Sequence, residues 1–278
     1  MAERIILLDG AMGSLLQKCS AGSLPKGFPE TMNLYQPELV TGIHRSYVEA
    51  GSEIIYTNTL GANAKKAKHA GFSVEDVVSA AVANARKACF THTRVALDIG
   101  PIGEMPAPYG DYEEEEMFSV FTEIITAGNN ADLIVLETMT DINEVLIAVK
   151  AARAISDLPV FATMTFTAFG KTIMGVTPEA AAKALTDAGV FALGMNCSLG
   201  PDEVYPIIEK LSSYTTLPLI VKPNAGMPDP KTGEYQIKPQ EFADKMKRIA
   251  DCGVRYMGGC CGTDPNYIKA MKSMVSQL

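Results

Sequence analysis

The sequence predicts an α/β protein, a single (β/α)8 TIM barrel that spans residues 1–278. Eight short apolar runs recur along the chain, with the near-continuous hydrophobicity of strands that are buried on both faces of a parallel sheet. The runs are residues 5–8, 53–57, 94–98, 132–136, 159–165, 190–196, 217–222 and 254–258. The chain length of 278 residues is close to the roughly 250 residues typical of this fold. A doubly wound open sheet is the alternative architecture.

The segments between these runs carry the signals of helices. In residues 74–90 the apolar side chains recur at helical spacing, which places them on one face of a helix. Asp141 followed by Glu144 resembles a capping box at a helix start. Glycines stand where a helical pattern gives way to the next strand, as left-handed C-caps do; they are Gly51, Gly189 and Gly253. Strand and helix therefore alternate along the whole chain.

The charge balance excludes two classes of partner. The chain has 24 Lys and Arg against 32 Asp and Glu, a net charge of −8 that is spread along the sequence, so we expect neither nucleic acid nor a membrane as a partner. The first residues lead directly into an apolar run without a basic leader, and no apolar run approaches the roughly 18 residues needed to cross a bilayer. The sequence predicts a cytoplasmic protein that acts on a small molecule or binds another protein.

Three cysteines follow two of the predicted strands. Cys197 comes after the sixth strand, and Cys260 and Cys261 come after the eighth, so the barrel brings them to one mouth, where active sites of this fold lie. Three thiolates leave a tetrahedral zinc ion one ligand short, which is typical of a catalytic site with an open position. Two other interpretations stay open: small buried residues, or a disulfide or redox pair of the adjacent cysteines.

Two carboxylates also follow predicted strands. Asp9 comes after the first strand and Glu137 after the fourth, where a buried carboxylate needs a cation or hydrogen-bond donors. A substrate ammonium group would supply both. A helix cap or a salt bridge to a lysine is the alternative role.

Seven motifs in order make the chain resemble a known family. They are DGAMG at 9–13, TNTLGAN at 57–63, DIGP at 98–101, ETM at 137–139, NCSLGP at 196–201, KPNAG at 222–226 and GGCCGT at 258–263. Together they resemble the homocysteine-binding domain family of homocysteine S-methyltransferases, and most of all the N-terminal homocysteine module of cobalamin-dependent methionine synthases. The resemblance covers nearly the whole chain and implies the same barrel fold.

The resemblance implies a metal site and its chemistry. In the family, the cysteines at the positions of Cys197, Cys260 and Cys261 bind zinc, and Asn224 matches a position that supplies an oxygen ligand when substrate is absent. A free thiol with a pKa of about 8.5 is only a few per cent thiolate at pH 7. Zinc removes that proton, so the bound homocysteine sulfur can attack a methyl group and yield methionine.

The resemblance also implies how the amino-acid part of homocysteine binds. Asp9 and Glu137 match the residues that hold its ammonium group. Backbone amides around Gly10 and Ala11 match those that receive its carboxylate.

The methyl donor is expected to arrive in trans, because the sequence ends one helix after the eighth strand. The resemblance favours methylcobalamin carried by a separate corrinoid protein. An S-methylmethionine or betaine donor is the alternative, as is a subunit that binds a thiol or a corrinoid partner without turnover.

Overall fold

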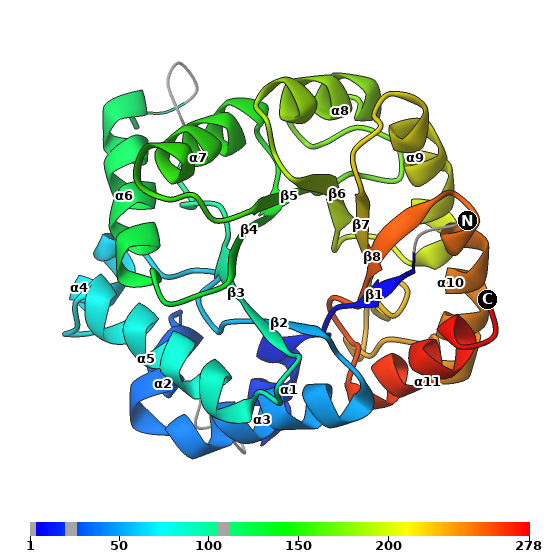
Figure 1. Ribbon diagram of the computed structural model, residues 1–278, viewed down its shortest axis with the longest axis horizontal. Helices are drawn as coiled ribbons and strands as arrows, with labels where there is room; N and C mark the ends of the chain where they lie inside the picture. The colour runs from blue at the N-terminus through cyan, green and yellow to red at the C-terminus, as the bar shows by residue number, and fades with distance from the viewer. Residues whose placement is uncertain (1–3, 20–26, 105–109, 111) are drawn as a thin grey trace.

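The computed structural model describes residues 4–19, 27–104, 110 and 112–278, and in it eight parallel strands form a central ring. Helices surround the ring, as Figure 1 shows. The strands are β1 (Ile6–Leu7), β2 (Ile54–Tyr56), β3 (Arg94–Ile99), β4 (Leu133–Met139), β5 (Val160–Met164), β6 (Ala192–Asn196), β7 (Leu219–Lys222) and β8 (Val254–Met257). Each lies within or overlaps a predicted run, so the predicted TIM barrel is confirmed.

The order of the strands excludes the open-sheet alternative. The sheet runs β1-β8-β7-β6-β5-β4-β3-β2, so the first strand pairs with the last. An isolated parallel bridge between Leu8 and Ile54 joins β1 to β2 and completes the ring. In a doubly wound sheet the first strand would lie inside the sheet, without this closure.

The helices cover the outside of the ring and follow the strands in chain order. They are α1 (Met12–Cys19), α2 (Met32–Tyr35), α3 (Pro37–Ala50), α4 (Ala64–His69), α5 (Val74–Ala88), α6 (Glu114–Ala127), α7 (Ile142–Ile155), α8 (Pro178–Asp187), α9 (Pro201–Ser213), α10 (Pro239–Ala250) and α11 (Pro265–Val275). A short 3-10 turn, Pro29–Thr31, precedes α2. Among the described residues, no helix combines the length and the apolar character that crossing a bilayer requires.

The helix boundaries follow from the local sequence. The apolar face predicted in residues 74–90 is buried along α5. The three glycines expected as C-caps, Gly51, Gly189 and Gly253, have φ values of 119°, 74° and 79°, in the left-handed region. The capping box at Asp141 forms only in part, because Asp141 accepts from the backbone of α7 while Glu144 accepts a bond from the Ile102 amide instead.

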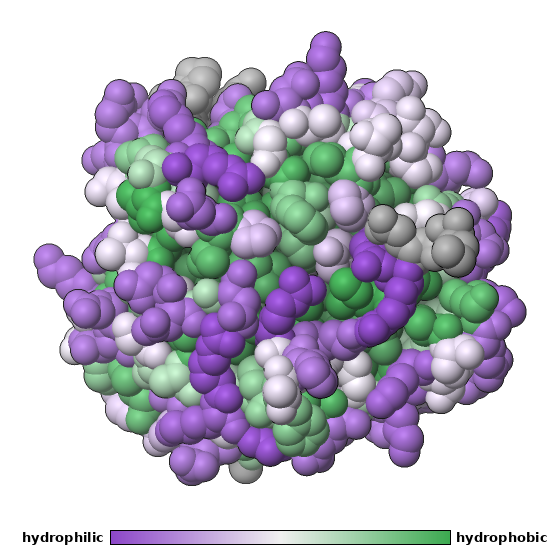
Figure 2. Space-filling model, in the orientation of Figure 1, coloured by the Kyte–Doolittle hydropathy of each residue, from purple (hydrophilic) through white to green (hydrophobic). Residues whose placement is uncertain are grey.

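Two apolar layers hold the barrel together. A small cluster fills its interior, with side chains such as Phe161, Ile220 and Tyr256, and a large cluster lies between strands and helices. In the space-filling view of the same face, hydrophilic side chains dominate the periphery and hydrophobic ones show between them toward the middle (Figure 2). The polar residues of the barrel mouth lie directly above this interior layer.

Candidate active site at the barrel mouth

The mouth of the barrel holds a polar layer directly above the apolar interior. Side chains of a strand alternate between its two faces, so a residue two positions after an inward-facing one also points inward. Three charged residues stand in that position: Asp98 after Ala96, Glu137 after Val135, and Lys222 after Ile220. With Asp9, Gly10, Ala11, Cys260 and Cys261 they line a cavity of about 180 Å³.

The three cysteines that follow β6 and β8 lie together beside this cavity. Their sulfur atoms all lie within 4.8 Å of one another, and the Sγ atoms of Cys197 and Cys261 are 3.8 Å apart. Two thiolates on a tetrahedral zinc ion, with Zn–S bonds of about 2.3 Å, are separated by about 3.8 Å. The cluster therefore has the dimensions of a tetrahedral metal site. All three are free cysteines, so the disulfide alternative is not what the structure contains.

Backbone geometry directs these thiols toward one another. Cys197 and Ser198 have φ values of 62° and 59°, a conformation that residues with side chains rarely adopt and that is often found at functional sites. The Cys260 amide donates to the Pro223 carbonyl at 2.8 Å, which ties the β8 loop to the β7 loop. Gly262, at φ 79°, provides the turn after the adjacent cysteines, and a Cβ atom there would lie 2.2 Å from Tyr235.

The thiols share negative charge unevenly. Hydrogen bonds from Cys197 and Cys260 lower the pKa of Cys261 to about 3. The hydrogen bond with Cys260 lowers the pKa of Cys197, but the bond with Cys261 and burial together raise it to about 11. A lowered thiol pKa favours metal binding, because the thiolate is the form that binds a metal.

Asn224 is held next to the cysteines by its backbone. Its amide donates to the Leu199 carbonyl at 2.9 Å, and the next amide, that of Ala225, donates to the Cys261 carbonyl at 3.0 Å. The side chain is buried, and its Oδ1 atom has no hydrogen-bond partner among the described residues. An unpaired buried oxygen is costly, so this atom fits the fourth, oxygen ligand that the family resemblance implies.

The two predicted carboxylates meet a lysine that the sequence reasoning missed. The Lys222 ammonium lies 3.0 Å from Asp9 and 3.6 Å from Glu137, and 3.5 Å from the centre of the Tyr56 ring. All these side chains are buried. Burial lowers the pKa of Lys222, but attraction to Asp9 and Glu137 outweighs it and raises the pKa well above its usual value. The lysine salt bridge, left open as an alternative, is therefore present.

Asn196, also missed, ties together the strand ends that carry the site. Its Oδ1 accepts from the Thr138 amide and from the Thr163 hydroxyl, both at 2.7 Å, and its Nδ2 donates to the Thr138 hydroxyl at 2.8 Å. These bonds fix the end of β4, with Glu137, relative to the end of β6, with Cys197. The alternation of side chains along β6 makes Asn196 face into the barrel, and this signal could have identified it from the sequence.

The predicted carboxylate-binding amides lie at the start of α1. Gly10 and Ala11 line the cavity and precede Met12, the first residue of that helix. The Ala11 amide donates to the Thr263 hydroxyl at 3.3 Å, a long bond. Amides at a helix N-terminus favour an anionic ligand.

Comparison with known proteins identifies the family of this chain. The profile described as homocysteine S-methyltransferase matches residues 6–275. The chain belongs to the homocysteine S-methyltransferase family. The family predicted from the seven motifs is therefore confirmed.

The chain is similar to part of two longer proteins. It is 30% identical to methionine synthase of Mycobacterium leprae and 31% identical to methionine synthase of Mycobacterium tuberculosis. Each match includes 100% of this chain but only 25% of the relative, so the chain spans about a quarter of their length. The metallated homocysteine methyltransferase MmuM from Escherichia coli shares the fold, with a TM-score of 0.84 and 24% identity over 98% of this chain and 96% of that one.

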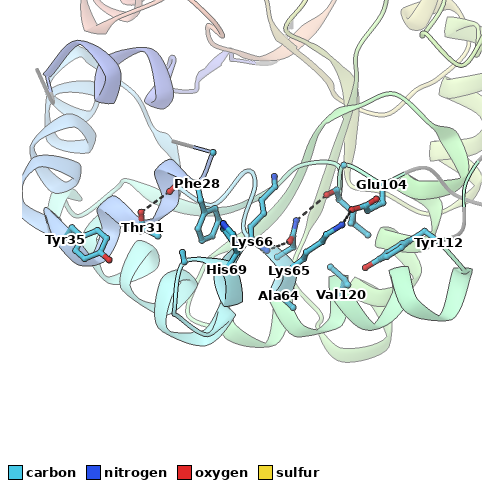
Figure 3. Close-up of a pocket in the computed structure, with 15 residues that line it drawn as sticks. Phe28, Thr31, Tyr35, Ala64, Lys65, Lys66, His69, Glu104, Tyr112 and Val120 are labelled. Atoms are coloured by element: carbon cyan, nitrogen blue, oxygen red, sulfur yellow. Dashed lines mark hydrogen bonds and ion pairs between the residues drawn. The ribbon is translucent and has the colours of Figure 1, made fainter. Parts of the chain in front are cut away.

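A larger cavity of this protein lies outside the barrel, away from the cysteines. It encloses about 820 Å³ between the segment before α2, α4 and α6. Figure 3 shows Phe28 and Tyr112 on its two sides and Lys65 reaching across to Glu104, with which it forms an ion pair. Size alone would favour this cavity, but the sulfur atoms and buried charges that chemistry needs line the smaller one.

Proposed function

We propose that this protein is a zinc-dependent homocysteine S-methyltransferase that forms methionine. One observation supports it above the others: three thiols whose sulfur atoms lie within 4.8 Å of one another, one pair of them at 3.8 Å, stand beside a cavity lined by buried carboxylates. A thiol-binding metal and an ammonium-binding group in one cavity match the two ends of homocysteine. We propose the cytoplasm as its location, because clustered free thiols persist in a reducing compartment.

Each part of the cavity has a proposed task. Cys197, Cys260 and Cys261 would hold zinc, and Asn224 would supply an oxygen ligand in the absence of substrate. When bound, zinc keeps the substrate thiol deprotonated, which removes a deficit of about 2 kcal/mol for a thiol of pKa about 8.5 at pH 7.

The protein orients the rest of the substrate. The amides around Gly10 and Ala11, at the N-terminus of α1, receive its carboxylate. The acidic cluster that contains Asp9 and Glu137 attracts its ammonium group. With both groups held, the sulfur is directed toward the open side of the mouth, where a methyl donor can approach in line.

We propose methylcobalamin, carried by a separate corrinoid protein, as the donor. The similarity to two methionine synthases over the whole of this chain supports this choice. The donor is the part of the proposal that depends on relatives rather than on the cavity itself.

The test is methionine formation by the zinc-loaded protein from homocysteine and one donor at a time: methylcobalamin, S-methylmethionine or betaine. We expect about one zinc per chain, methionine from methylcobalamin, and loss of both zinc and product in Cys261→Ser. Cys89→Ser is the matched control, because Cys89 is a free cysteine on the outer side of the barrel, after α5. Full turnover by metal-free protein would refute the zinc chemistry, and methionine from S-methylmethionine or betaine alone would refute the donor.

A further inference from the structure

Tyr235 lies against the turn that follows the two adjacent cysteines. It belongs to the segment between β7 and α10, where an antiparallel bridge joins it to Pro228. Its ring lies over the backbone of Gly262, so closely that a Cβ atom on that residue would stand 2.2 Å from the ring carbon Cγ. The glycine after Cys261 therefore makes room for this ring.

The hydroxyl group of Tyr235 is a hydrogen-bond partner of the Cys261 thiol. A phenol can donate its proton, whereas a thiolate, the form that binds a metal, can only accept, so the hydroxyl group is the donor. Tyr235 is not among the described residues that line the cavity of about 180 Å³ beside the cysteines. The hydroxyl group therefore acts on the protein's own sulfur and not on a molecule in that cavity.

The other two cysteines also have a donor or a cation close by. The Ser198 amide, in the left-handed conformation at φ 59°, hydrogen-bonds to the Cys197 thiol. The positive charge of Lys222 attracts Cys260. Each sulfur atom of the cluster thus has a neighbouring group that withdraws electron density from a thiolate.

A site with several thiolates must direct a methyl group to only one of them. Under the proposed function, the substrate sulfur joins three cysteine sulfurs, and it alone should be methylated. All three cysteines are partly exposed, so a methylating agent at the barrel mouth can reach them as well. Methylation would convert a cysteine thiolate into a neutral thioether and weaken the metal site.

We infer that Tyr235 protects Cys261 from methylation and thereby directs the methyl group to the substrate sulfur. A hydrogen bond from a neutral donor lowers the nucleophilicity of a thiolate and leaves it in place as a ligand. Tyr235 acts through Cys261 and is a positioning residue. This inference rests on the proposed function and goes beyond it, because it assigns a task to a residue outside the metal and substrate contacts.

Methylation of the zinc-loaded full chain by iodomethane, without homocysteine, tests this role. A thiolate attacks the methyl carbon, an S–CH3 bond forms, and iodide leaves. Peptide mass spectrometry gives the initial rate at each cysteine, with Cys89, after α5, as the internal reference. Tyr235→Phe removes the hydroxyl group and keeps the ring, whereas Tyr235→Ala removes both. Tyr214→Phe is the matched control, because Tyr214 is exposed and follows the last residue of α9.

The hydroxyl group should affect one cysteine selectively. In Tyr235→Phe, the rate at Cys261 relative to Cys89 should rise about tenfold, because a hydrogen bond to a charged group is lost. The rate at Cys197 should change less than about twofold, since its donor is a backbone amide that the substitution leaves in place.

The cobalt-substituted protein provides a second measurement that does not depend on methylation. Loss of a hydrogen bond raises the energy of the sulfur electrons, so the thiolate-to-metal charge-transfer band should move to longer wavelength in Tyr235→Phe. The band of Tyr214→Phe should match that of the wild type. Zinc content and the thermal unfolding midpoint are recorded for every variant.

The outcomes separate this inference from the proposed function. Equal rates at Cys261 in the wild type and Tyr235→Phe, with zinc bound to both, would overturn the inference. A faster rate confined to Tyr235→Ala would also overturn it, because the ring that covers Gly262 would then be the protecting group. Failure to form methionine, with the methylation pattern as expected, would count against the proposed function alone. A wild-type chain that binds no zinc would overturn both.

Discussion

Replacing Lys222 with methionine removes the cation that pairs with the buried carboxylates and should destabilise the protein strongly. At separations of 3.0 Å from Asp9 and 3.6 Å from Glu137, each attraction amounts to about 5 kcal/mol at an effective dielectric constant of about 20. The desolvation of a fully buried ammonium group offsets much of this gain. Breaking such a pair from one side costs about 3–5 kcal/mol, because the remaining charges stay buried and unpaired.

The loss of stability in Lys222→Met should depend on pH. Without the lysine, the folded-state pKa values of Asp9 and Glu137 rise further above their unfolded values, and protonation of these carboxyls limits the damage at low pH. Stability of Lys222→Met is therefore retained in acid and lost as the pH rises. The difference from the wild type should be about 3–5 kcal/mol at pH 8 and smaller at pH 5.5.

Urea unfolding with saturating zinc, followed by circular dichroism, measures this difference at both pH values. Asp9→Asn together with Lys222→Met removes one charge of each sign and should recover part of the loss, since coupled residues are not additive. A Lys222→Met variant within about 1 kcal/mol of the wild type at pH 8 would show that the lysine does not compensate these carboxylates.

Three further predictions concern separate features. Asn224→Ala should weaken zinc binding about tenfold in a chelator competition without homocysteine, and much less with homocysteine present; equal losses in both conditions would exclude an oxygen ligand that the substrate replaces. Burial lowers the pKa of His44 from 6.5 to about 3, so the unfolded chain takes up a proton below pH 6.5 that the folded chain does not. The stabilisation from neutral His44 is present above pH 6.5 and is lost as the pH falls toward 3. About 2 kcal/mol of the free energy of unfolding should be lost between pH 7 and pH 5. In urea titrations, the free energy of unfolding of His44→Leu should fall less over the same range. In Gly194→Ala, the new Cβ atom would lie 1.9 Å from the Ile220 carbonyl oxygen on the neighbouring strand, so we expect at least about 3 kcal/mol of destabilisation; an unchanged melting temperature would contradict this packing.

The fold could be predicted because its signals are local. A strand buried on both faces needs a continuous apolar run, and a helix end in the left-handed conformation favours glycine, so each element could be read from a few adjacent residues. The capping box at Asp141 marks the limit of local reasoning. Glu144 found a tertiary partner, the Ile102 amide, which competes with the helix cap and cannot be seen from the sequence around α7.

Site residues could be predicted where the residue type alone indicates their chemistry. They could not be predicted where the strand register decides which side chain faces into the barrel. Cysteines and carboxylates at strand ends stand out because their burial needs a reason. Lys222 stands inside one of the seven motifs, but its residue type alone indicates no role, since a lysine at a strand end is usually exposed. Counting in steps of two from Ile220 would have placed it inside the barrel, opposite Asp9 and Glu137.

The hydrogen bonds of Asn196 bear on the length of the substrate that the proposed site would accept. Because they hold the end of β4 to the end of β6, they fix the span between the Glu137 carboxylate and the Cys197 thiol, which under the proposed function the substrate would bridge. Under the proposed function, cysteine, one methylene shorter than homocysteine, would bridge this span less well. Discrimination between the two amino acids would then come from a fixed span at the rim of the sheet, without a wall that excludes the smaller molecule.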